Sequence, residues 1–167
     1  ATPVDWLALL KHPLCSLGMS TADCRAAARF AEVKFWRGRQ NAGTPLQQLA
    51  WLRETNLPEA EQVIIATLLT ALGTALQPLH DRLQDGGVVL TDLLAAHLQA
   101  AETLVATAES AGAERLWQGA AGEAAATLFA AITPAAVGQT LPHGAEYSAL
   151  VRAWLDEAVV RPDGIAP

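Results

Sequence analysis

The sequence predicts an all-α fold, an irregular bundle of about six to eight helices forming one domain over residues 1–167. Alanine and leucine dominate, valine and isoleucine are sparse, and charged residues make up only 17% of the chain. This composition favours helices over strands. Apolar residues also recur at helical spacing between capping residues and helix-stopping glycines and prolines. A chain of this length can bury a core of its own.

The first helix is expected from Asp5 to Lys11. Thr2 is its candidate N-cap and Pro3 its first position, where the missing N–H of proline costs least. Pro13 biases His12 away from helical backbone angles, so the helix should end there.

The second helix should open at a capping box in residues 20–23 and stop at Gly38. Its Arg25 and Arg29 are one turn apart, so they should share a face. Thr44-Pro45 should start a third helix, with the threonine as cap and the proline at the first position.

The fourth helix should open at Pro58 and Glu59. Its apolar residues lie on more than one side, which predicts a central position in the bundle. Pro78 should kink this helix or split it in two. Gly86-Gly87 should end it.

Thr91 is the expected cap of a fifth helix, and Ala111-Gly112 should stop it. A sixth helix is expected over about 114–132. It contains Gly119 and Gly122, and glycine is unfavourable inside a helix, so the pair indicates either a close helix approach or a break.

A last helix is expected from Ala145 to Ala158, followed by the β-like pair Val159-Val160. We interpret residues 158–167 as a linker or the start of a further element. The chain also opens without an initiator methionine. We therefore expect a segment excised from a longer protein.

The charge distribution points to one candidate contact surface. The net charge of −6 opposes binding to nucleic acid as a whole, but residues 1–39 hold six basic and three acidic residues, a net +3, and the remainder sums to −9. The basic residues are candidates for contact with DNA phosphate or with an acidic neighbouring domain, and the alternative is a solvated helix face. They are Lys11, Arg25, Arg29, Lys34, Arg37 and Arg39.

No catalytic, cofactor or metal site is predicted. Cys15 and Cys24 are the only cysteines, and they form neither a CxxC motif nor a pattern typical of a zinc site or a disulfide framework. The phosphate-binding glycine loops GxxxxGK[ST] and GxGxxG do not occur. The histidines have no second ligand at helical spacing; they are His12, His80, His97 and His143.

We expect a cytoplasmic protein. We expect no membrane-spanning helix, because we judge that no apolar run approaches the roughly 20 uncharged residues that span a bilayer. The first residues also lack the basic and then apolar pattern of a signal peptide. Reduced cysteines fit the same compartment.

Three stretches carry a family resemblance that covers nearly the whole chain. LLKHPLCSLGMSTADCR, from Leu9 to Arg25, resembles a segment of the accessory 2B-like part of superfamily 1 helicase-nucleases. ERLWQGAAGEA (114–124) and EYSALVRAWLDEAVVRP (146–162) resemble the alphaproteobacterial form of the AddB family, a subunit of the AddAB double-strand-break repair helicase-nuclease.

The resemblance implies a bacterial, non-catalytic helical domain that interrupts a degenerate helicase-like domain. Such a domain would shape the path of duplex or single-stranded DNA, or the contact with an AddA-like partner. ATP and Mg would be used by the complex, and an iron-sulfur cluster would lie in another domain. Neither Cys15 nor Cys24 matches the cluster cysteines of the family, so no catalytic or cofactor residue carries over.

Two alternatives remain open. One is a stand-alone helical adaptor that binds a protein through its acidic face. The other is a small helical enzyme using His80 or His97, which the missing second ligands disfavour. A role in lining DNA requires Arg25, Arg29, Lys34, Arg37 and Arg39 to be exposed together, whereas an adaptor tolerates their burial or dispersal.

Overall fold

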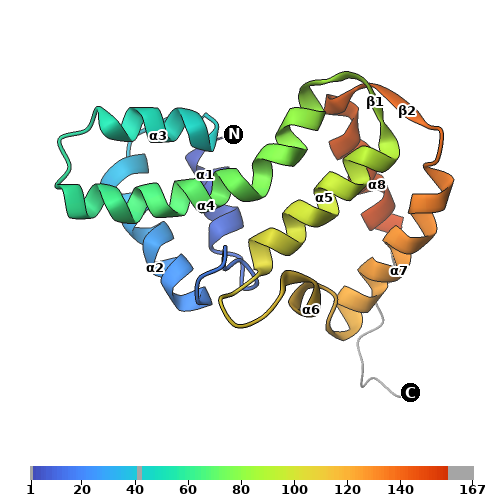
Figure 1. Ribbon diagram of the computed structural model, residues 1–167, viewed down its shortest axis with the longest axis horizontal. Coiled ribbons are helices and arrows are strands. Elements are labelled where there is room, and N and C mark those ends of the chain that lie inside the picture. Colours follow the sequence, from blue (N-terminus) through green and yellow to red (C-terminus); the bar gives the residue numbers. More distant parts are fainter. Residues whose placement is uncertain (1, 41–42, 158–167) are drawn as a thin grey trace.

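The computed structural model describes residues 2–40 and 43–157 (Figure 1). Within these residues it contains eight α-helices and a single two-stranded antiparallel sheet, so the predicted all-α, multi-helix fold is confirmed. The 2B-like assignment stays a prediction.

The elements follow one another in this order. The first half contains α1 (Pro3–Leu10), α2 (Thr21–Ala31), a π-helical turn η1 (Glu32–Trp36), α3 (Pro45–Arg53) and α4 (Glu59–Gln84). The second half contains β1 (Gly86–Val89), α5 (Leu90–Val105), α6 (Gly112–Leu116), α7 (Gly119–Ala135), β2 (Thr140–His143), a 3-10 turn η2 (Gly144–Glu146) and α8 (Tyr147–Glu157).

The first three helices start at the residues that the sequence predicts. Thr2 accepts a hydrogen bond from the N–H of Asp5, and Thr44 accepts one from the N–H of Gln47. In both helices the third residue returns a hydrogen bond to the cap, and a proline follows the cap directly. Ser20 caps α2 by accepting a hydrogen bond from the N–H of Asp23, and its hydroxyl donates to the Asp23 carboxylate, so the reciprocal backbone bond of the predicted capping box is not formed. These side chains satisfy backbone donors that a helix leaves free at its N-terminus.

Helix α4 is central, as predicted. It packs against α2 and α3 with its first part and against α5 with its second part (Figure 1). The helix is continuous through Pro78, so the prediction of a split is wrong. Its later part turns toward the connection with β1 (Figure 1), and Pro78 in that part removes one backbone hydrogen bond, which fits the predicted kink.

The expectation about membrane-spanning length also needs correction. Helix α4 has 26 residues and is long and apolar enough, by length and composition alone, to cross a membrane. No Asp, Glu, Lys or Arg lies between Glu61 and Asp81. Central helices of folded domains can meet the same two criteria, but only 28% of the apolar window of α4 is buried in this structure.

The apolar side chains form two cores. The first lies among α1 to α4, and its fully buried members include Leu10, Cys24, Ile65, Leu68, Leu69 and Leu72. The second lies among β1, α5, α7 and α8, and is built on Val88, Leu90, Leu93, Leu94, Ala136, Tyr147 and Val151. Leu79 and Leu83 of α4 pack against the second core. Helix α4 therefore contributes to both.

The start of α5 differs from the prediction because a sheet sets it. Strands β1 and β2 pair antiparallel, with Val88 opposite Leu141. The N–H of Leu90 donates to the carbonyl of Gln139 at 3.0 Å, and α5 begins there without a capping side chain. Thr91 is therefore not the N-cap. The start of α5 therefore depends on the pairing of two segments that are distant in sequence.

The predicted sixth helix is two helices. Gly112, expected to stop α5, instead begins α6, and α5 already ends at Val105. Trp117 and Gln118 separate α6 from α7. Gly119 has a φ of +70°, and a Cβ on Gly122 would lie 2.6 Å from the carbonyl carbon of Trp117. The glycine pair thus marks both a break and a close approach.

The last helix lies where it is predicted, and its expected final residue, Ala158, is outside the described residues. It opens with the turn η2 at Gly144–Glu146 and continues as α8 to Glu157. A Cβ on Gly144 would lie 2.3 Å from the carbonyl oxygen of Leu83, so glycine lets this turn pack directly on α4. The predicted β-like pair Val159-Val160 and the linker over 158–167 lie outside the described residues.

Candidate functional site

The predicted contact residues lie mainly on one stretch, which we call the basic segment: Arg25, Arg29, Lys34, Arg37 and Arg39, on α2, η1 and the residues after it. Four of the five are exposed, and Arg25 is half-buried. Among the described residues, Arg25, Arg29 and Arg37 have no carboxylate within salt-bridge distance. Their guanidinium groups therefore remain available to an anionic partner.

The two lysines among the candidates are tied to carboxylates. Lys11 Nζ lies 2.7 Å from Glu32 Oε2, and Lys34 Nζ lies 2.9 Å from Glu61 Oε1. The Lys34 ammonium also lies 5.8 Å from the centroid of the Phe30 ring. The structure therefore does not place both lysines in one free cluster with the arginines.

Arg39 is held by aromatic rings. Its guanidinium carbon lies 4.6 Å from the Phe35 ring centroid and 5.6 Å from that of Trp51, and its Nε donates to the Phe35 carbonyl at 2.9 Å. Stacking of this kind fixes the side chain while leaving the charge exposed. Arg39 thus belongs to the rigid part of the basic segment.

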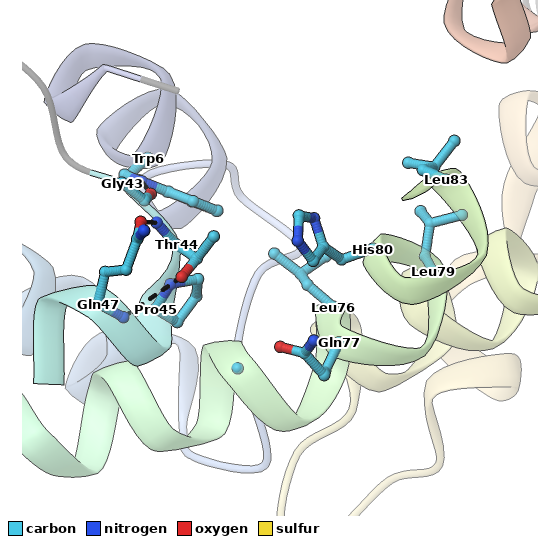
Figure 2. A pocket seen from close by; sticks show the side chains of 11 residues that line it. Trp6, Gly43, Thr44, Pro45, Gln47, Leu76, Gln77, Leu79, His80 and Leu83 are labelled. Atoms are coloured by element: carbon cyan, nitrogen blue, oxygen red, sulfur yellow. Dashed lines mark hydrogen bonds between the residues drawn. The ribbon is translucent and has the colours of Figure 1, made fainter. Parts of the chain in front are cut away.

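A cavity of about 470 Å³ lies between the first helices and the later part of α4 (Figure 2). Trp6 and Thr44 stand on one side, and Leu76, His80 and Leu83 on the other. Trp6 Nε1 donates to the carbonyl of Gly43 at 3.3 Å, which fixes the indole at the rim. The polar side chains that line this largely apolar hollow are those of Thr44, Gln47, Gln77 and His80. This composition is typical of a binding cavity.

His97 lies in a second cavity of about 490 Å³, which shares Leu79 and Leu83 with the first. Its Nδ1 is 3.0 Å from the hydroxyl oxygen of Tyr147. Burial lowers the pKa of His97 and raises the pKa of Tyr147, so both groups favour their neutral forms. His80 and His97 thus line separate hollows and do not form one two-histidine site.

Arg115 forms a polar cluster that the sequence did not predict. Its Nη1 donates to Ser16 Oγ at 2.9 Å and to the carbonyl of Val105, and its Nη2 donates to Thr21 Oγ1 at 3.4 Å. The Ser16 and Thr21 hydroxyl oxygens are 2.9 Å apart. Arg115 lies in the stretch 114–124 that resembles the AddB family. No sequence pattern connects it to the loop with Ser16, almost one hundred residues earlier.

The two cysteines are neighbours at this cluster. The Cys15 thiol donates a hydrogen bond to the Cys24 sulfur; this contact and burial both raise the pKa of Cys15, whereas the contact lowers the pKa of Cys24 against the opposing effect of burial. Both cysteines are free and buried. The sequence did not predict this contact. The chain reverses at Leu17 and Gly18, and the spacing of the two cysteines does not reveal that turn.

Three sites thus emerge: the basic segment, the cavity of Figure 2, and the cluster around Arg115. In the part of the chain that the structure describes, no group of three or more His, Cys, Asp or Glu residues is placed to hold a metal ion. Searches among family models, curated proteins and solved structures find no match to this chain.

Proposed function

We propose that this chain is a non-catalytic accessory domain of an AddB-like helicase-nuclease subunit that acts in double-strand-break repair. In this role the basic segment contacts the DNA backbone, or the AddA-like partner beside it. ATP, Mg and the iron-sulfur cluster of such a complex would be held by parts of the machine outside this chain. The sequence resemblance suggests the family, and the basic segment supplies the contact.

The observation that carries the proposal is the exposure of Arg29, Lys34, Arg37 and Arg39 on the short stretch from α2 through η1 to the residues just after it. Exposed cations on a rigid helix can release counterions from a phosphate backbone, which drives binding without sequence specificity. The rest of the chain beyond residue 39 carries a net charge of −9 and repels the same backbone. The two effects together orient the domain with α2 and η1 toward the nucleic acid.

The ion pairs of the lysines are compatible with this role. In the Lys11–Glu32 pair both side chains keep about two fifths of their surface exposed. Surface pairs of this kind contribute only about 0–1 kcal/mol, so a phosphate can replace the carboxylate at small cost. Lys11 and Lys34 therefore add to the contact only when DNA is bound.

The test is a salt titration of DNA binding with the purified domain and fluorescent duplex and single-stranded DNA. We expect weak binding that declines steeply between about 50 and 200 mM salt. The variant Arg29→Gln/Arg37→Gln should weaken binding and reduce the slope of log K against log salt by about 1.8 for duplex DNA, close to 0.9 for each lost phosphate contact.

A matched control removes the same charge elsewhere. Arg53 and Arg152 are also exposed but lie outside the basic segment, so Arg53→Gln/Arg152→Gln should leave the slope near that of the unmodified chain. An equal effect of both double variants would contradict the assigned surface. Tight binding that ignores salt, or nuclease activity of this domain with Mg²⁺, would contradict the non-catalytic role.

A protein adaptor is the second candidate, and an apolar surface favours it. Phe30 of α2 lines a shallow hollow with Val63 and Ile64 of α4, which are 57% and 43% exposed. If this surface carries the function, Val63→Ser/Ile64→Ser should abolish binding of an AddA-like subunit while the salt slope on DNA stays unchanged. If the Val63→Ser/Ile64→Ser variant still binds the AddA-like subunit, the result supports the basic segment as the functional surface.

A further inference from the structure

The loop between α1 and α2 is fixed against the end of α5. The N–H groups of Ser16 and Leu17 both donate to the carbonyl of Leu104, at 2.9 and 3.0 Å. The N–H of Gly18 donates to the carbonyl of Ala106 at 2.8 Å. Leu17 and Gly18 have φ values of +51° and +78°, and this left-handed pair turns the chain back toward α2.

The returning loop and the first turn of α2 then make two side-chain contacts. Ser16 meets Thr21 through their hydroxyl groups, and Cys15 meets Cys24 through their thiols. Thr21 and Cys24 are one helical turn apart and share a face, while Cys15 and Ser16 are consecutive in the loop. The backbone of the loop therefore places Cys15 beside Cys24. The Ser16–Thr21 contact and the hydrogen bond from Arg115 to Ser16 hold the loop in this position.

We propose that Cys15 and Cys24 form an oxidisable dithiol, a modification site at which a small peroxide closes an intrachain disulfide between the loop and α2. The Cys24 sulfur attacks one peroxide oxygen, the O–O bond breaks, and Cys24 becomes a sulfenic acid while one water leaves. The Cys15 sulfur then attacks the Cys24 sulfur, the S–O bond breaks, and the hydroxide leaves with the Cys15 proton as the second water. Two thiols lose two electrons and the peroxide gains them.

The order of the two steps follows from the contact. Cys24 accepts the hydrogen bond from Cys15, which lowers its pKa and favours the nucleophilic thiolate there. Cys15 keeps its proton and acts second. Both residues are almost fully buried, at 3% and 0% exposure, so only a small oxidant reaches them, through local opening of the loop.

The site is independent of the proposed function, although it lies beside it. A Cys15–Cys24 bond would lock residues 15–24, which include Ser20, the N-cap of α2. Helix α2 carries Arg25 and Arg29, so oxidation would fix the start of the basic segment.

The experiment treats the reduced, purified chain with hydrogen peroxide and follows its intact mass. We expect the loss of two hydrogen masses, a peptide that links Cys15 to Cys24 in a non-reducing digest, and full reversal by dithiothreitol. The variant Cys15→Ser should instead trap a sulfenic acid on Cys24 that reacts with dimedone. Cys24→Ser should give neither the disulfide nor comparable labelling of Cys15.

Three results would overturn the proposal. One is an unchanged mass under conditions that oxidise a free cysteine peptide. The second is a disulfide between two chains, which would scale with protein concentration. The third is stepwise addition of oxygen to both cysteines without a link between them. The digest of the unmodified chain decides among these even if a serine variant fails to fold.

Discussion

Helices α1, α2 and α3 each begin at a side chain that accepts a hydrogen bond from the helix backbone, whereas α5, α6 and α7 begin without one. The caps of the first group are Thr2, Ser20 and Thr44. The second group begins after Val89, Ala111 and Gln118, whose side chains make no capping hydrogen bond. Helix α4, which follows the first group, begins after Pro58 without a capping side chain. For α1, α2 and α3 the helix start is a local property of four residues. In the second half it is a property of tertiary contacts.

The contacts that replace caps in the second half are close backbone approaches. Gly112 lies against the carbonyl of Glu102, and Gly144 lies against the carbonyl of Leu83. Trp117 Nε1 also donates to the carboxylate of Glu102 at 2.8 Å, which holds α6 against α5. The second half should therefore be sensitive to added volume at glycines, and the first half to the loss of capping side chains.

The largest expected effect comes from Gly112→Ala, which attacks the second half at a backbone contact. The added Cβ would meet the carbonyl of Glu102 far inside van der Waals distance, so α6 must move away from α5. We expect a loss of about 1–3 kcal/mol in the free energy of unfolding, measured by urea titration.

Gly86→Ala is the matched control, because a Cβ there meets nothing within 4 Å. It should change the stability by only a few tenths of a kcal/mol, the usual range for open surface sites. Equal losses in the two variants would contradict the assigned packing of α6, because the effect of alanine on the unfolded chain is stabilising at both positions.

A smaller effect is expected at the caps, where the same substitution can be made in both halves. Thr44→Ala removes the hydroxyl that accepts the N–H of Gln47 and should cost about 1 kcal/mol. Thr91→Ala should be close to neutral, because α5 starts before Thr91 and needs no capping side chain. Urea titrations of the two variants give the difference directly. A larger loss of stability in Thr91→Ala than in Thr44→Ala would show that Thr91 caps α5, and would contradict the difference between the two groups of helices.

The smallest expected effect is a pH dependence that belongs to the second half alone. Burial lowers the pKa of His97 in the folded state below its ordinary value of 6.5. The contribution of neutral His97 to the free energy of unfolding is therefore fully present above pH 6.5. It is lost as the pH falls through the folded-state pKa, because the unfolded chain binds the proton more readily. The urea midpoint should decline between pH 7 and pH 5.

His97→Phe should flatten that decline, since it removes the titrating group. The phenyl ring also cannot make the hydrogen bond to Tyr147, so the variant is compared with itself across pH rather than with the unmodified chain at one pH. An unchanged slope would assign the pH dependence to other groups.

The accuracy of prediction from sequence follows the same division. The starts of α1, α2 and α3 and the central place of α4 could be predicted, because a cap needs only its neighbours in sequence and the apolar faces of α4 are visible in its periodicity. The start of α5 could not, because it depends on β1 meeting β2 across some fifty residues. Gly119 and Gly122 raised the correct alternatives without choosing between them.

The candidate sites divide in the same way. The basic segment was predicted as a set, since charges in one short stretch share a region of surface however the chain folds. The pairing of Lys34 with Glu61, and of Lys11 with Glu32, could not be predicted. The cluster of Arg115 with Ser16 and Thr21 had no sequence pattern, because its members come from opposite halves of the chain.

By itself the sequence determined the helical class, the locally capped first half and the uneven distribution of charge. These depend on backbone propensity, on hydrogen bonds within one turn and on net composition, which act over a few residues. Only the tertiary structure decided the sheet, the break between α6 and α7, the cavity beside His80 and the contact of Cys15 with Cys24. The sheet and the cavity join residues distant in sequence, while the cysteine contact and the break depend on backbone turns at Leu17–Gly18 and Gly119, and close packing in three dimensions selects all four.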